Sequence, residues 1–232
     1  MSSNNDLRWI PLTMFQRMKQ LQNLNLSGNH LINIDQGKNY KLTVQKLILV
    51  KFPPFLTKLD MSHNQLTTMM ARRFLAKANS LTTINLSHNQ IEVIEPSALS
   101  HLQNLEEIDL SYNKLTEVGH KALYGLVRCH EINLEHNLIR SVTSYLCSYI
   151  YMFSRSDISP TAFINFGHKT FQNKTINLAN NQLAFVMADW VQEIENEAKF
   201  CQVQSECGEE VKIQMAENPI YCDCNMQVIL LK

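Results

Sequence analysis

The chain has 232 residues, 45% of them hydrophobic, and its 21 basic residues are balanced by 21 acidic ones. This length and composition fit one domain of ordinary size, or one elongated repeat domain with a substantial core. The balanced charge argues against a nucleic-acid-binding protein, which would show a basic surplus.

Neither a signal peptide for export nor a membrane helix is visible in the sequence. The first residues, MSSNNDLRWIP, lack the cationic segment and apolar run of a signal peptide. No stretch approaches the roughly 20 apolar residues of a membrane helix. We expect no membrane segment in this chain, and secretion would require a signal outside it.

Six segments share the pattern LxxLxLxxNxL with conservative substitutions. In chain order they are LQNLNLSGNHL (21–31), LTKLDMSHNQL (56–66), LTTINLSHNQI (81–91), LEEIDLSYNKL (105–115), CHEINLEHNLI (129–139) and NKTINLANNQL (173–183). The middle copies recur every 24 or 25 residues, and the pattern resembles the leucine-rich repeat.

This resemblance implies an α/β repeat solenoid shaped as a horseshoe. Each LxL is expected to form a short strand whose apolar side chains point inward while the residues between them point outward. Stacked strands would form a parallel sheet on the concave face, and irregular or short helical segments would close the convex side. The chain is expected to begin inside a repeat, because counting back one unit from Asn29 reaches Asn5.

The spacing of the repeats also predicts the domain organisation. Repeats are expected over 1–183, with an insertion at about 35–55 and a degenerate repeat at about 153–172. Residues 184–210 are expected to form an irregular or helical insertion with a cysteine pair. The last repeat strand and a truncated cap are expected over 211–232.

One asparagine recurs in every copy where the chain leaves the strand. Buried there, its amide would satisfy backbone groups of adjacent turns that would otherwise lose hydrogen bonds. The predicted structural ladder consists of Asn29, Asn64, Asn89, Asn113, Asn137 and Asn181.

The motif Asn218-Pro219-x-x-Cys222-x-Cys224 resembles the start of the cysteine-rich cap of extracellular leucine-rich-repeat proteins. Together with the 24-residue unit, it is typical of the Toll-like receptor and chaoptin-like class of ectodomain. In that family the two cysteines pair with later ones, which this chain lacks.

Two further cysteines lie nearby. Cys201 and Cys207 could pair with each other, or serve as partners of Cys222 and Cys224, and the sequence leaves the three connectivities open. A zinc site is the competing interpretation of the CxC motif, and we expect no metal. Cys129 and Cys147 are expected to be buried small hydrophobic residues.

Strand geometry assigns the residues that face a partner. The candidate ligand-binding residues of the concave face are Lys58, Asp60, Thr83, Asn85, Glu107, Asp109, Tyr112, Glu131, Asn133 and Glu135. An acidic group on adjacent repeats would attract a basic partner or a calcium ion. It consists of Glu107, Asp109, Glu131 and Glu135. The alternative is a solvated face whose acidic residues only reflect the repeat consensus.

The residue before each ladder asparagine forms a second column, with His63, His88, Tyr112 and His136 in four successive copies. Stacked histidines could bind a metal or respond to pH. The alternative is that this position simply tolerates almost any residue.

Ser87 and His88 raise the question of catalysis. Their side chains should point to different faces of an extended segment, so the histidine cannot activate the serine. A shallow solenoid face also offers no oxyanion hole, and we expect no enzymatic activity and no cofactor.

Three sequons are candidate glycosylation sites, at Asn25, Asn85 and Asn173. The first two arise wherever the repeat reads LNLS, and Asn173 is the favoured acceptor. Sugars on Asn25 and Asn85 would obstruct part of the concave face.

The sequence as a whole favours a non-enzymatic protein-binding scaffold at the cell surface or outside the cell. Its concave and lateral faces would recognise a protein ligand, one with a basic patch if the acidic group is used. The alternative is a structural module for homophilic cell adhesion.

Overall fold

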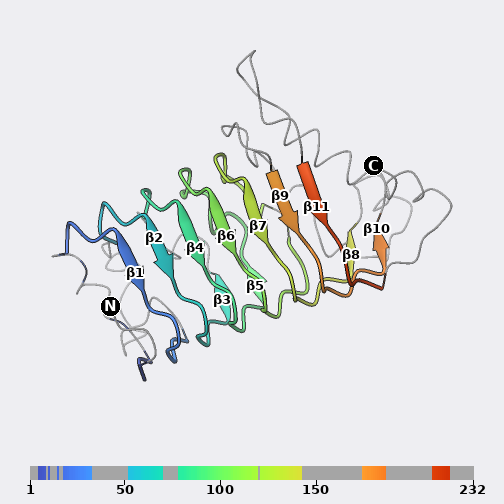
Figure 1. Cartoon of the computed structure of the whole chain (residues 1–232), viewed down its shortest axis with the longest axis horizontal. Helices are drawn as coiled ribbons and strands as arrows, with labels where there is room; N and C mark the ends of the chain where they lie inside the picture. The colour runs from blue at the N-terminus through green and yellow to red at the C-terminus, as the bar shows by residue number, and fades with distance from the viewer. Residues whose placement is uncertain are drawn as a thin grey trace, which may run out of the picture.

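A row of parallel strands organises the molecule, as the computed structural model shows (Figure 1). The structure describes residues 5–8, 10, 15, 18–32, 52–69, 78–119, 121–142, 174–186 and 211–219.

Seven of the described strands form one sheet in the order β1-β2-β4-β6-β7-β9-β11. They are β1 (Asn23–Asn25), β2 (Lys58–Asp60), β4 (Thr83–Asn85), β6 (Glu107–Asp109), β7 (Glu131–Asn133), β9 (Lys174–Asn177) and β11 (Val211–Gln214). Every neighbouring pair is parallel, and equivalent repeat positions face each other, as Ile84 faces Ile108. The predicted repeat solenoid with a parallel sheet is confirmed.

Side chains alternate across the sheet as the LxL pattern predicts. The central residue of each three-residue strand of this sheet is at most 2% exposed, and its two neighbours on β4 are half-buried. Residues of the second half of the unit, such as Ile94, Leu99 and Leu102, complete the core and are at most 5% exposed. The core is therefore a continuous apolar column to which each turn of the chain adds one layer.

The recurring asparagine joins each turn to the one before it. The Nδ2 group of Asn89 donates to the carbonyls of Leu86 and Ser87 in its own turn and of Met61 in the preceding turn, at 3.0–3.1 Å. Its Oδ1 atom accepts a hydrogen bond from the N–H of Leu66 at 3.0 Å. One buried amide thus satisfies four backbone groups that water cannot reach.

The same pattern recurs along the solenoid. Asparagine side chains bond to the preceding turn at Asn29, Asn64, Asn89, Asn113, Asn137, Asn181 and Asn218. Asn218, interpreted from the sequence as the start of a cap, is thus a seventh member of the ladder. At the other end, the N–H of Leu7 donates to Asn29 Oδ1 at 3.2 Å.

Three units are longer than the rest, yet they add no strand to this sheet between their neighbours. β1 pairs directly with β2, β7 with β9, and β9 with β11. The direct pairing of β7 with β9 differs from the expectation of an intervening degenerate repeat, because a full repeat would place its strand between them. The segment expected to form it, 153–172, lies outside the described residues, as do 33–51 and 187–210.

Short strands and turns make the opposite side of the described solenoid. β3 (Thr68–Met69) pairs with β5 (Val93–Ile94), and β8 (Ser141–Val142) pairs with β10 (Phe185–Val186). Turns rather than helices follow in the described convex segments. A search of the described residues found no helix long and apolar enough to cross a membrane.

The ladder makes a quantitative prediction for a central asparagine. Asn113→Ala removes three hydrogen bonds from Nδ2 and one accepted from the N–H of Ile91. Because these backbone groups are buried, we expect a loss of about 3 kcal/mol in the free energy of unfolding, measured by urea denaturation. The control is Asn104→Ala, which removes one exposed bond to Asn79 and should cost less than about 1 kcal/mol. Equal losses in the two variants would contradict the role assigned to the ladder.

A glycine on the convex side gives a second stability prediction. Gly125 has a φ of 90°, and a Cβ atom there would lie 2.6 Å from the carbonyl oxygen of Ser100. We expect Gly125→Ala to lower the free energy of unfolding by at least about 2 kcal/mol. Gly119→Ala is the matched control, since its nearest neighbour, Glu117 Oε1, is 3.8 Å away. If both variants unfold at the same urea concentration, a Cβ atom at residue 125 does not clash with the carbonyl oxygen of Ser100.

Candidate functional site

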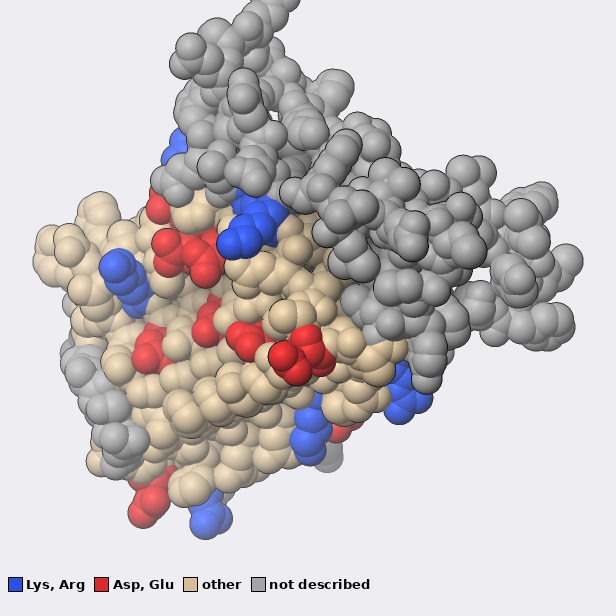
Figure 2. Space-filling view, turned by 45° about the vertical axis from the view of Figure 1, so that its right-hand side comes forward, with Lys and Arg blue, Asp and Glu red and all other residues tan. Residues whose placement is uncertain are grey.

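The outward face of the seven-stranded sheet carries the candidate site. Acidic side chains gather on this face, with few basic ones among them (Figure 2). Among the candidate residues, Lys58, Glu107 and Glu131 are exposed, whereas Thr83 is half-buried.

Three carboxylates form what we call the acidic patch: Glu107, Asp109 and Glu131. Glu107 and Glu131 are direct register partners on β6 and β7, about 4.8 Å apart along the sheet. Asp109 lies on β6, two residues after Glu107, on the same face. Among the described residues, no basic side chain makes a salt bridge with any of the three. The patch therefore presents concentrated negative charge to solvent.

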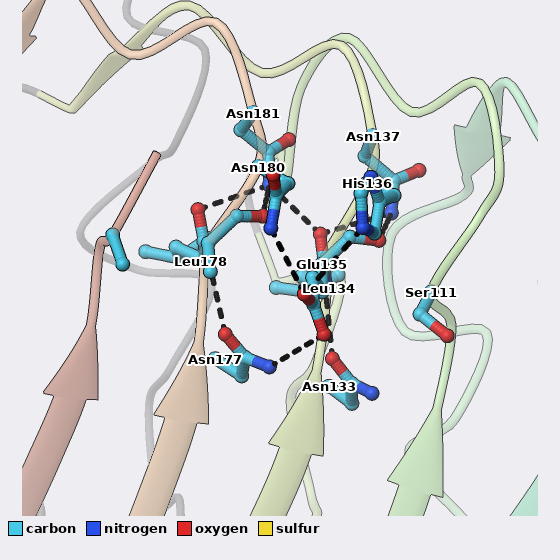
Figure 3. A network of polar contacts seen from close by, with 12 residues as sticks. Ser111, Asn133, Leu134, Glu135, His136, Asn137, Asn177, Leu178, Asn180 and Asn181 are labelled. Carbon is cyan, nitrogen blue, oxygen red and sulfur yellow. Dashed lines mark hydrogen bonds and ion pairs between the residues drawn. The ribbon is translucent and has the colours of Figure 1, made fainter. Parts of the chain in front are cut away.

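Glu135, predicted to belong to this group, is bound within the fold instead (Figure 3). Its carboxylate accepts hydrogen bonds from the side-chain amides of Asn177 at 3.1 Å and Asn180 at 3.0 Å. It also lies 3.5 Å from His136 Nε2. Glu135 is therefore a structural link between two repeats.

The Asn or Asp at the end of each strand has a local structural task. The Oδ1 atom of Asp109 accepts the N–H of Ser111 at 2.9 Å, and Asn133 accepts that of Glu135 at 3.1 Å. The same turn forms at Asn25, Asp60, Asn85 and Asn177. This closure explains why only Asn or Asp occupies the column, since their short side chains reach the backbone two residues ahead. One side-chain oxygen is thereby already occupied in four candidate ligand-binding residues, which are Asp60, Asn85, Asp109 and Asn133.

Three of the serines that close these turns are buried, although strand alternation places them on the partner-facing side. Ser62, Ser87 and Ser111 are at most 6% exposed. The hydroxyl of Ser87 donates to Asn85 Oδ1 at 2.8 Å, and that of Ser62 donates to Asp60 in the same way. The chain is already turning at these residues, so strand alternation no longer applies. The surface that could contact a partner is therefore narrower than the sequence indicates.

Four rings stand in one column at the rim of the sheet. His63, His88, Tyr112 and His136 stack face to face, with successive ring centroids 4.2, 4.2 and 4.1 Å apart and interplanar angles of 10°, 10° and 21°. We call this set the ring column. Tyr112 is 45% exposed, so the edges of the rings form part of the protein surface.

The backbone beneath the ring column is left-handed. The φ angles of these four residues are 52–53°, and Gly28 (64°) and Asn180 (52°) have the same conformation in neighbouring units. Several residue types nevertheless occupy this position, including Tyr112 and Glu217 at φ angles of 53° and 55°. Glycine, asparagine and histidine are the residue types that accept a positive φ most readily, whereas β-branched residues are strained there.

The stacked geometry does not suit a shared metal ion. An imidazole binds a metal in the plane of its ring, and nearly parallel planes 4.2 Å apart, as in His63 and His88, have no common position for the ion. No group of three potential ligands that could hold a metal occurs among the described residues.

The surroundings of His88 oppose its protonation. Partial burial lowers the pKa of His88 below its ordinary value of 6.5, and His63 and His136 lower it further because like charges repel. Asp109 opposes this shift by stabilising the charged imidazolium. The central histidine therefore stays neutral to a lower pH than a free histidine would.

The Ser87–His88 pair does not form a nucleophile and its base. The Ser87 hydroxyl is turned toward Asn85, and the His88 ring is stacked between His63 and Tyr112. An activated serine requires the histidine within hydrogen-bond reach of the hydroxyl oxygen.

The modification and cysteine sites fall in two groups. Asn25 is exposed on β1, and Asn85 is half-buried between Asp60 and Asp109 on neighbouring strands. Cys129 is buried, as expected. The remaining predicted sites lie outside the described residues, and they are Asn173, Cys147, Cys201, Cys207, Cys222 and Cys224.

Together these features define a class of protein. One short parallel strand per turn, a buried asparagine joining each turn to the last and an apolar column inside characterise a repeat solenoid with an exposed sheet.

The repeats are leucine-rich repeats. A leucine-rich-repeat family model matches residues 79–139, and a second one matches 53–68. Residues 53–68 and 79–139 of this chain are therefore leucine-rich repeats, and the other copies share their pattern.

Solved structures share the fold over almost the whole chain. In Toll from Drosophila, solved in complex with Spatzle, the match has 18% identity and a TM-score of 0.62, and covers 99% of this chain and 28% of Toll. An internalin (inlF) from Listeria monocytogenes matches with 16% identity and a TM-score of 0.55, over 94% of this chain and 47% of its own. A leucine-rich-repeat protein from Leptospira interrogans has 22% identity and a TM-score of 0.53, over 97% and 50%. The chain thus spans half or less of each of these proteins.

The lowered pKa of His88 predicts a pH-dependent stability. The unfolded chain takes up a proton near pH 6.5, before the folded protein does, so stability should fall as the pH drops below about 6.5. The decline due to His88 should level off below its folded pKa. We expect His88→Asn to show a shallower fall in melting temperature between about pH 7.5 and 5 than the wild type.

The substitution is matched to the backbone, because Asn180 already adopts the same positive φ. Comparing the two slopes removes the contribution of every other titrating group. Parallel slopes would show that His88 is not the residue responsible.

Proposed function

We propose that this protein is a non-enzymatic recognition scaffold that binds a protein partner through the outward face of its sheet. The partner would present a basic patch to Glu107, Asp109 and Glu131, at the cell surface or outside the cell. The rigid stack of repeats would hold these carboxylates in fixed positions, so the binding energy is not spent on ordering the site.

The observation that carries the proposal is the in-register pair Glu107–Glu131. Like charges directly opposite each other on adjacent strands destabilise a sheet. This pair is exposed and makes no salt bridge with a described residue. Local conflicts of this kind are expected at functional sites, where a partner supplies the missing counter-charge.

Two lysines frame the pair in the same column of the sheet. Lys58 lies two strands before Glu107, and Lys212 lies two strands after Glu131, with a threonine between in each case. The column therefore reads positive, negative, negative, positive. A partner whose basic residues are flanked by acidic ones would match the whole column, whereas a lysine-rich segment would match only its two central glutamates.

The same column bears on homophilic adhesion, the alternative function. If two copies met face to face about a twofold axis between β6 and β7, β6 of one copy would lie on β7 of the other. Glu107 would face Glu131 and Lys58 would face Lys212. This full overlap is repulsive, and we therefore favour a different protein as the partner.

The similar structures support the proposal at the level of protein binding. Toll was solved in complex with Spatzle, and this chain resembles part of Toll in fold. The extracellular location is likewise proposed by analogy with that fold and with the sequence resemblance to secreted ectodomains.

The test uses a lysine-rich peptide as the probe and fluorescence anisotropy as the readout. The double variant Glu107→Gln/Glu131→Gln should weaken binding about tenfold, if each charge contributes roughly 0.7 kcal/mol at moderate salt. Its free energy of unfolding should not fall, because the substitution removes a repulsion.

The matched control is Asp6→Asn/Glu92→Gln, which changes the net charge equally at two exposed positions away from the patch. It should leave the affinity within about twofold of the wild type. If both double variants lose affinity equally, binding depends on net charge alone and the proposed site is wrong.

A further inference from the structure

The ring column ends at Gly28. The N–H of Gly28 donates to the carbonyl of Ser62 at 3.0 Å, as the N–H of His63 donates to Ser87 at 3.0 Å. Its φ of 64° matches the left-handed backbone of the other units. Gly28 thus occupies the position next to His63 in the same register, but it carries no ring.

One face of His63 is therefore left without a stacking neighbour. His63 is exposed, and within the described part of the chain His88 alone stacks on it. The opposite end differs, because Asn180 follows His136 and its amide is bound to Glu135 at 3.0 Å. Among the described residues, only the Gly28 end of the ring column combines a ring face that no other ring stacks on with a position that carries no side chain.

Tyr112 shows which chemical group fits this column. Its phenol ring lies between two imidazoles, with centroids 4.2 Å from His88 and 4.1 Å from His136. A six-membered aromatic ring is thus accepted at the spacing that the repeats impose. Aromatic side chains gain from stacking in this way and are common anchors of protein interfaces.

We propose that the space above Gly28 is a docking site for a tyrosine-like aromatic side chain of a protein partner, which stacks on His63 and extends the ring column by one ring. The site rests on the proposed function only in that a protein approaches this face. It uses no charge, and it lies just beyond the ends of β1 and β2, whereas the acidic patch lies on β6 and β7. Binding at one site can therefore fail while binding at the other persists.

The experiment uses the full chain and N-acetyl-tyrosinamide as an uncharged probe, with the imidazole C–H resonances followed by NMR. Stacking should give a saturable upfield shift of the His63 ring protons and leave those of His136 unchanged. Gly28→Tyr should abolish this response, because the new ring fills the site as Tyr112 fills its own position. Gly28→Ala, which adds no ring, should retain the response.

Two further variants complete the test. His63→Asn, which keeps a residue type tolerated at positive φ, should lose the probe-dependent shifts around Gly28 and decides the question if Gly28→Tyr does not fold. Glu107→Gln/Glu131→Gln should retain the full response while losing the lysine-rich peptide. Equal shifts at His63 and His136, or an unchanged response in Gly28→Tyr or His63→Asn, would overturn the proposal. Loss of the response in the Glu107/Glu131 variant would overturn it as well.

Discussion

The buried asparagine amide is the interaction on which the rest of the molecule depends. Each turn of the chain exposes backbone groups where the strand ends, and the interior offers no water to satisfy them. Asn89 and its equivalents bond simultaneously to their own turn and to the preceding one. The spacing and direction of successive turns are thereby fixed, and the sheet, the acidic patch and the ring column inherit that regularity. Recognition by this protein is consequently a property of columns that run across repeats.

The two candidate surfaces arise from different parts of the repeat. The acidic patch lies on strand residues, where alternation leaves side chains such as Glu107 free to vary. The ring column lies at the strand exit, where the left-handed backbone restricts the residue and aligns its side chain with those of neighbouring units. Charge would guide the partner toward the face, while the rings would require a closer geometric fit. A partner that uses both would combine long-range attraction with short-range selectivity.

Sequence periodicity was sufficient for the fold and for the buried positions, because the core and the ladder depend on residues that every copy repeats. It did not show that Glu135 binds Asn177 and Asn180, because these residues lie 42 and 45 positions further along the chain. The burial of Ser87 was also missed, because the chain turns before the alternation of the strand would end. The sequence places Asn218 in frame with Ile213 and Met215, as the expected last repeat strand requires. The neighbouring cysteine motif favours the start of a cap at the same residue, so the sequence alone does not assign Asn218 to the ladder.

The three long units have a consequence for how such a protein diversifies. In the sequence, their extra residues fall between a ladder asparagine and the next strand of the sheet, and β1 and β2, β7 and β9, and β9 and β11 are still hydrogen-bonded neighbours. Insertions at this phase of the repeat change neither the strand register nor the order of columns on the sheet. The length of a unit and the residues on the outward face of the sheet can therefore change independently. A unit can therefore gain residues in small steps without changing which residues stand on the outward face of the sheet.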